Sequence, residues 1–101
     1  MTRTAWRELR EGRRRAMSEA ERAEFDRAYT EARFAAEVGE RIRAAREAAG
    51  LSQRDLAARM GTSQAAIARL EAGGVGATLT TLHRVAAALG LELRIDLRPS
   101  A

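Results

Sequence analysis

Residues 51–73, LSQRDLAARMGTSQAAIARLEAG, place the tightest constraint on the fold of this chain. Apolar residues recur at helical spacing on both sides of Gly61, which predicts two short helices joined by a tight turn. Glycine suits the turn because it adopts the left-handed backbone conformation at little cost. Ser52 and Thr62 are expected to cap the two helices at their N-terminal ends. The inward residues are expected to be Leu56, Ala57, Met60, Ala66, Ile67 and Leu70.

The segments on either side of this stretch have the same helical spacing. One helix is predicted to end at Gly50, with Val38, Ile42, Ala45 and Ala49 on its inner face. After a glycine-rich loop, another is predicted to begin at Thr78 or Thr80 and to end at Gly90, with Leu79, Leu82, Val85, Ala86 and Leu89 inward. Residues 37–90 are therefore expected to form one all-α domain with an aliphatic core.

Residues 1–36 differ in composition and are predicted to form an N-terminal helical arm. They contain every aromatic residue of the chain: Trp6, Phe25, Tyr29 and Phe34. Residues 1–17 are dense in charge and are expected to be disordered or weakly helical when alone. Ser18 opens an S-x-x-E capping signature, after which an amphipathic helix is expected. This helix either continues through Gly39 into the next one or hinges there.

Residues 91–101 are predicted to contain a C-terminal β-strand. The sequence LELRIDL at 91–97 alternates strictly between apolar and polar residues, which is the period of a strand. One strand cannot satisfy its own backbone, so it is expected to pair with the same strand of a second copy or with a sheet edge in another protein. The alternative is a frayed tail. The expected dimerisation residues are Leu91, Leu93, Ile95 and Leu97.

Composition narrows the function classes. The chain has no Cys, which excludes disulfides and thiolate metal sites. His83 is the single histidine, and neither a nucleophile–base pair nor a phosphate-binding loop is present, so we expect neither an enzyme nor a bound metal or cofactor. No apolar run could span a membrane, and the chain is expected to be cytoplasmic. The net charge of +4 is weak evidence for a nucleic-acid partner, because a codon bias toward Arg has the same effect.

The central stretch also carries a family motif, L-S/T-Q-x-x-L-A…G…I-x-x-L/I-E-x-G. The matching residues are Leu51, Ser52, Gln53, Leu56, Ala57, Gly61, Ile67, Leu70, Glu71 and Gly73. The chain therefore resembles the Xre/Cro-like, phage-repressor type of helix-turn-helix proteins over about residues 38–90. The resemblance implies a bundle of four to five helices that binds double-stranded DNA. The alternative is an unrelated four-helix domain with a similar turn.

The resemblance assigns the DNA contacts residue by residue. Gln can bond adenine and Arg can bond guanine in the major groove, which admits a helix. The expected base-reading residues are Ser63, Gln64, Ala65, Ala68 and Arg69, and the expected phosphate contacts are Gln53, Thr62 and Arg54. Ala65 stands where some relatives place a second base-reading Gln, so fewer bases are read directly. Arg46 and Glu71 match positions that form a partly buried salt bridge in several relatives.

A narrower resemblance concerns the two ends of the chain. The aromatic arm and the ending ALGLELRIDLRP look like antitoxins of RelE/HigB-type toxin–antitoxin pairs. This implies a homodimer that represses its own operon and neutralises an RNase toxin, with Trp6, Phe25, Tyr29 and Phe34 as toxin anchors. Alternatively, the aromatics of the predicted arm helix dock on their own domain. The rival functions are a stand-alone repressor and an interaction module that does not bind DNA.

Overall fold

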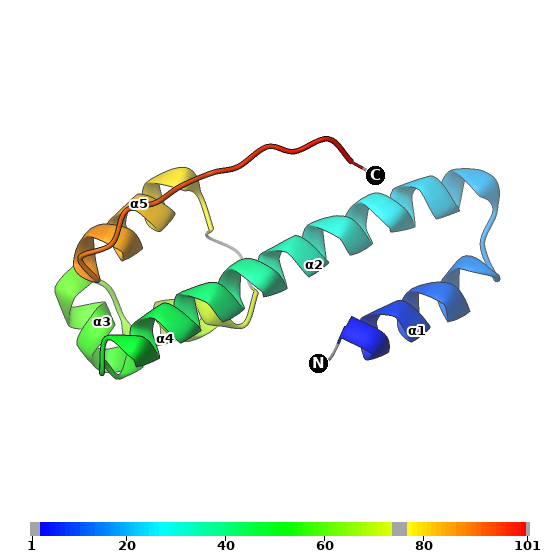
Figure 1. The fold of residues 1–101 in the computed structure, drawn as a ribbon. Coiled ribbons are helices and arrows are strands. Elements are labelled where there is room, and N and C mark those ends of the chain that lie inside the picture. The colour runs from blue at the N-terminus through cyan, green and yellow to red at the C-terminus, as the bar shows by residue number, and fades with distance from the viewer. Residues whose placement is uncertain (1–2, 74–76, 101) are drawn as a thin grey trace.

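The computed structural model describes residues 3–73 and 77–100. Within them lie five helices: α1 (Arg3–Arg14), α2 (Glu19–Ala48), α3 (Gln53–Met60), α4 (Gln64–Glu71) and α5 (Leu79–Ala88). Helix α2 forms the axis of the molecule: α1 folds back along its N-terminal half, and the other three helices gather around its C-terminal half (Figure 1). The all-α fold expected from the sequence is thereby confirmed for these residues. The glycine-rich loop predicted after Gly73 lies largely outside them.

Side-chain caps set the starts of the helices. Ser18, Ser52 and Thr78 each accept a hydrogen bond from a backbone N–H three residues on. The sequence predicts the first two caps, and the structure decides for Thr78 over Thr80 as the third. The predicted cap at Thr62 is wrong by one residue, because Ser63 has the extended backbone of a cap and its hydroxyl accepts the N–H of Ala66 at 3.1 Å.

An aliphatic core holds α2, α3, α4 and α5 together. Leu56 and Ile67, from the two helices of the central stretch, are almost completely buried, at 0% and 1% exposure. The other buried members are Ile42, Ala57, Met60, Leu70 and Val85. Truncating a core residue of this kind to alanine costs about 2–5 kcal/mol, so this cluster dominates the stability of the domain.

Helix α2 runs without a break through Gly39, so the arm and the core region share one helix. The predicted boundary between residues 36 and 37 therefore lies inside α2. Gly39 is buried where α2 crosses the C-terminal end of α4. A Cβ at this position would lie 2.9 Å from the carbonyl oxygen of Leu70 and closer still to that of Glu71. The absence of a side chain thus permits the close crossing of the two helices.

Replacing Gly39 by alanine should lower the free energy of unfolding by about 1–3 kcal/mol, because two backbones must separate to admit the methyl group. The helix-propensity gain of alanine, about 1 kcal/mol at most, opposes this loss. Urea denaturation measures the difference. Gly12→Ala in α1 is the matched control, since nothing lies within 4 Å of its Cβ position. Equal stability of the two variants would contradict this account of the crossing.

The N-terminal residues fold back as α1, contrary to the expectation of disorder or weak helicity. The ring of Trp6 meets that of Tyr29 edge-on at 5.9 Å between centroids, and the Arg10 guanidinium lies 5.1 Å from the centroid of Tyr29. Arg14 donates a hydrogen bond to Asp26 at 2.9 Å. These contacts bury Tyr29 and dock α1 on its own chain, because α2 extends far enough to offer α1 a partner (Figure 1).

The predicted C-terminal strand is not formed in the single chain. Residues 91–100 carry no helix or strand, and the segment runs back beside α2 (Figure 1). A strand needs ladder hydrogen bonds to a neighbouring strand, and the described residues contain no other strand. Ile95 and Leu97 are consequently 63% and 92% exposed.

Candidate nucleic-acid interface

Helices α3 and α4 are joined by a three-residue turn that fixes their mutual orientation. Gly61 has φ 65°, in the left-handed region, and ends α3. The N–H of Thr62 donates to the carbonyl oxygen of Ala57 at 2.9 Å. Ile67 and Leu70 then hold the inner face of α4 against the core. The opposite face of α4 is left open to solvent.

The structure places the predicted base-reading residues together on this outer face. Ser63, Gln64, Ala65 and Arg69 are exposed, and Ala68 is half-buried between them. Gln64 and Arg69 lie about 7.5 Å apart along the helix axis, at about 1.5 Å of rise per residue. The face therefore presents two long hydrogen-bonding side chains with small residues between them.

A chain of hydrogen bonds connects this face to the interior. The Gln64 amide donates to the Gln53 side-chain oxygen at 3.0 Å. Gln53 in turn donates to Glu71 at 3.2 Å. Arg46 closes the chain with two bonds to Glu71, at 2.6 and 3.0 Å. Gln53 thus joins the candidate phosphate site to the candidate base-reading site, a link that was not inferred from the sequence.

Arg46 and Glu71 form a buried, bidentate ion pair between α2 and α4. Their side chains are 10% and 4% exposed. A further bond from Arg46 to the carbonyl oxygen of Leu51, at 2.8 Å, also secures the start of the central stretch. Burial raises the pKa of Glu71, but hydrogen bonds from Arg46 and Gln53 outweigh it and hold this pKa below its ordinary value. The hydrogen bond to Glu71 raises the pKa of Arg46.

Acidification should destabilise the fold, because protonation of Glu71 removes one charge of this pair. The folded-state pKa lies below the ordinary value of 4.5, so the stabilisation is complete above about pH 4.5 and is lost as the pH falls through the folded pKa. Thermal unfolding between about pH 3 and pH 6 measures the effect. Glu71→Gln should flatten the profile without abolishing it, since hydrogen bonds from Ser52 also lower the pKa of Asp55. Parallel profiles for the two proteins would contradict the assignment.

The remaining arginines have varied surroundings. Arg54 is exposed on α3, free to approach a phosphate, and Arg43 pairs with Glu47 at 3.0 Å on the surface of α2. Arg84 donates instead to the carbonyl oxygen of Met60, and Arg59 donates to that of Ala88 at 3.1 Å. The last two bonds fasten α3 to α5, a structural role that the sequence did not reveal for Arg59.

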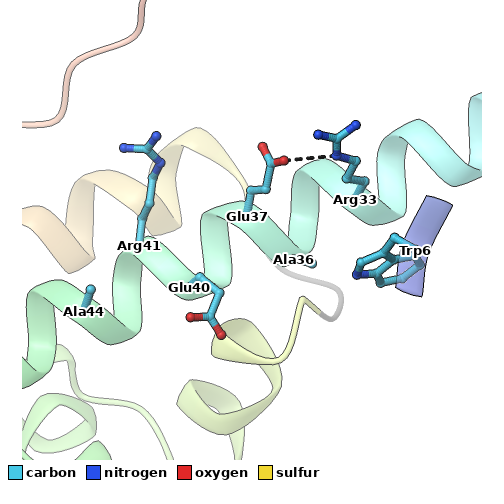
Figure 2. Close-up of a pocket in the computed structure, with 7 residues that line it drawn as sticks. All are labelled: Trp6, Arg33, Ala36, Glu37, Glu40, Arg41 and Ala44. Carbon is cyan, nitrogen blue, oxygen red and sulfur yellow. Dashed lines mark hydrogen bonds and ion pairs between the residues drawn. The ribbon is translucent and has the colours of Figure 1, made fainter. Parts of the chain in front are cut away.

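A hollow of about 500 Å³ lies beside α2, and none of its lining residues belongs to α4 (Figure 2). Trp6 of α1 stands at one end, and the other lining residues are Arg33, Ala36, Glu37, Glu40, Arg41 and Ala44. Arg33 pairs with Glu37 at 3.2 Å, whereas Glu40 and Arg41 point to different sides of the helix (Figure 2). The polar groups do not converge on one point, so this hollow is not the candidate site. In the ranges that the structure describes, no group of side chains has the make-up of a metal site.

The helix-turn-helix family model matches residues 42–95, more than half of the chain. The chain belongs to the Xre/Cro-like helix-turn-helix family. The match covers α3, the turn, α4 and α5, together with the end of α2. Within the family fold, α4 is the second helix of the motif, and its open face is the one described above.

One relative is an uncharacterized HTH-type transcriptional regulator, y4dL, of Sinorhizobium fredii. The two proteins are 45% identical over 56 residues, which are 55% of this chain and 29% of that protein. The chain thus aligns with less than a third of that relative's length. No solved structure matches the chain. Among the described residues of this helix-turn-helix protein, none of the helices has the length and apolarity needed to cross a bilayer.

Proposed function

We propose that the chain is a sequence-specific DNA-binding regulator of transcription, in which α4 enters the major groove. The observation that carries the proposal is the open face of α4, where Gln64 is held by Gln53 and, through it, by the buried pair of Arg46 and Glu71. A preorganised side chain loses less conformational entropy when it binds. The name of the S. fredii relative, an HTH-type transcriptional regulator, agrees with this function.

The proposed DNA contacts are of two kinds: some side chains recognise bases, and others bind phosphates and so position the protein on the duplex. Gln64 would bond an adenine and Arg69 a guanine, the base edges that their side chains fit best. Gln53 and Arg54, at the N-terminal end of α3, would bind backbone phosphate, since the N–H groups and dipole of a helix start favour an anion. Thr62, which lines a hollow of about 200 Å³ together with Arg69, would add a further phosphate contact. Only two long side chains per copy read bases, so a full site requires two copies.

Selection from a randomised duplex library tests this function. The full chain should enrich a palindrome with half-sites about 34 Å apart, one turn of DNA. Its affinity for the enriched site should fall steeply with salt, as phosphate contacts require. If no sequence is enriched and the binding does not depend on salt, the chain is an interaction module and the proposal fails.

The finer function that we propose is that of an antitoxin, whose arm binds a RelE/HigB-like toxin. The support lies in the exposed apolar residues of the arm: Phe34 on α2 is 66% exposed, and Leu9 on α1 is 41% exposed. Of the aromatic anchors, Trp6 and Phe25 are half-buried beside Tyr29, which is buried. A toxin would therefore meet the outer faces of α1 and α2, unless α1 swings away from α2 on binding.

A stand-alone repressor is the second candidate, and the burial of Tyr29 favours it. When Trp6 and Tyr29 satisfy each other within the chain, fewer aromatic anchors remain for a partner. Co-expression with the product of the adjacent gene, followed by mass measurement, separates the two functions. A stable complex that Phe34→Ala and Leu9→Ala together weaken supports the antitoxin function. The absence of any complex supports the stand-alone repressor.

A further inference from the structure

Leu91, Ile95 and Leu97 form an exposed apolar stripe on the C-terminal segment. The same segment also carries charged residues in a regular pattern. Between its apolar residues stand Glu92, Arg94, Asp96 and Arg98, whose charges alternate in sign. Within the part of the chain that the structure describes, Arg98 and Asp96 are the two of these four residues that form an ion pair, at 2.6 Å, and both are exposed. No backbone hydrogen bond within the described residues involves 92–100. The segment therefore has backbone groups available for pairing with another strand and side-chain charges that alternate in sign.

The proposed function requires a dimer, and on that basis we infer that two copies pair these segments as an antiparallel β-ribbon centred on Ile95. In this register Arg94 lies opposite Asp96 of the second copy, and Glu92 lies opposite Arg98. Leu93 lies opposite Leu97, and Ile95 faces itself. Opposite charges in directly opposed positions stabilise a pair of strands, and like charges destabilise it.

Three other antiparallel registers and the parallel one are less favourable, for reasons that are visible in the sequence. Centring the ribbon on Arg94 or Asp96 sets like charges against each other, and so does a parallel, in-register pairing. Centring it on Leu93 pairs Glu92 with Arg94 but brings Asp96 opposite Gly90, the residue with φ 68° just after α5. A shift by an odd number of residues places apolar side chains opposite charged ones.

Two further features fit the register centred on Ile95. Pro99 falls opposite Leu91, at the end of the ladder, where a residue without an N–H is tolerated. The apolar face of the ribbon also has a surface to cover. An apolar groove of about 600 Å³ runs between α2, α5 and the C-terminal segment, and its lining includes Phe34, Val38, Leu82, Val85, Leu89 and Leu93. Docking of the ribbon on this groove would bury both its own apolar stripe and Phe34 at the edge of the groove.

Cysteine cross-linking tests the register directly, because the chain has no Cys of its own. Ile95→Cys alone should form a disulfide-linked dimer under mild oxidation. Leu93→Cys and Leu97→Cys should each remain unlinked alone, since identical positions would lie about 13 Å apart along the ribbon, beyond the reach of a disulfide. Mixed in equal amounts, these two variants should cross-link to each other. Self-linking of position 93 or 97 would overturn the register and leave the dimer intact.

Charge reversal provides an independent readout of the dimer dissociation constant. Arg94→Asp and Asp96→Arg should each weaken the dimer on the order of tenfold, because each variant places like charges opposite each other at two positions of the ribbon. The double variant should restore the affinity. A ribbon centred on Leu93 or Leu97 predicts that the double variant stays weak, so failure of the rescue overturns the register. Circular dichroism should show unchanged helicity, because these residues lie outside the helices.

The outcomes also separate this inference from the function on which it rests. Sedimentation equilibrium of the unmodified chain should show a dimer. A dimer that cross-links elsewhere refutes the register alone. A monomer at all concentrations refutes the inference together with the dimeric part of the proposed function, whereas the enrichment of a DNA sequence by α4 is measured separately.

Discussion

The double variant Gln64→Ala/Arg69→Ala should lose at least about 30-fold in affinity for the operator half-site, because each base-reading pair is worth about 1–3 kcal/mol. Both side chains are exposed on α4, so the free energy of unfolding should change by no more than about 0.5 kcal/mol. Fluorescence anisotropy at one fixed salt concentration measures the affinity for the selected duplex and for an unrelated one. Specific binding should be lost, whereas much of the weak, salt-dependent binding to the unrelated duplex should remain.

Two arginine variants sharpen this experiment. Arg43→Ala removes the same charge from the surface of α2, where Arg43 pairs with Glu47, and should leave operator binding nearly unchanged. Arg54→Ala should weaken binding to both duplexes by a similar factor, since a phosphate contact carries no sequence information. Unchanged operator binding in the Gln64/Arg69 double variant would discard α4 as the recognition helix.

Arg46→Met should destabilise the fold by about 3–5 kcal/mol, because it leaves the buried carboxylate of Glu71 without its counter-charge. A small domain has only about 5–15 kcal/mol of total stability, so a large part of the chain would unfold at moderate denaturant concentration. Urea denaturation followed by circular dichroism measures the loss. Arg46 also holds the Glu71 carboxylate to which Gln53 donates a hydrogen bond. The variant should therefore leave Gln53, and with it Gln64, less firmly positioned.

Companion variants identify the cause of this loss. Arg46→Lys keeps the charge but not the planar fork that bonds both oxygens of Glu71, and should recover only part of the stability. The double variant Arg46→Met/Glu71→Met removes both charges and should be more stable than Arg46→Met alone. If Arg46→Met costs no more than the surface variant Arg43→Ala, the ion pair does not support the fold.

The helices around Gly61 were predictable because their signals are local. A serine or threonine hydroxyl caps a helix within three residues, and a glycine ends one by its own backbone freedom. The inward residues of the central stretch followed from the helical period, and the structure buries Leu56 and Ile67 as expected. The cap at Ser63 was missed by one residue, since adjacent Thr and Ser are equally good caps in a sequence.

Part of the candidate site was also readable in advance. The family resemblance assigned expected DNA contacts to Gln53 and Gln64, and the helical period predicted that Gln64 lies on the outer face of its helix, where it is indeed exposed. That Gln53 bonds both Gln64 and Glu71 was not readable, because Gln53 lies on α3 whereas both of its partners lie on α4. Such contacts depend on how α3 is oriented against α4, which the turn at Gly61 fixes.

The sequence by itself determined the all-α class, the turn at Gly61, the aliphatic core and the membership of a helix-turn-helix family, because all of these rest on local periods and short motifs. Only the tertiary structure decided that α1 docks on α2 through Trp6 and Tyr29, and that the arm and the core share one unbroken helix. It also decided that residues 91–100 form no strand within one chain. The physical reason is that docking and strand pairing depend on a partner surface, and the period of a segment does not specify where that surface lies.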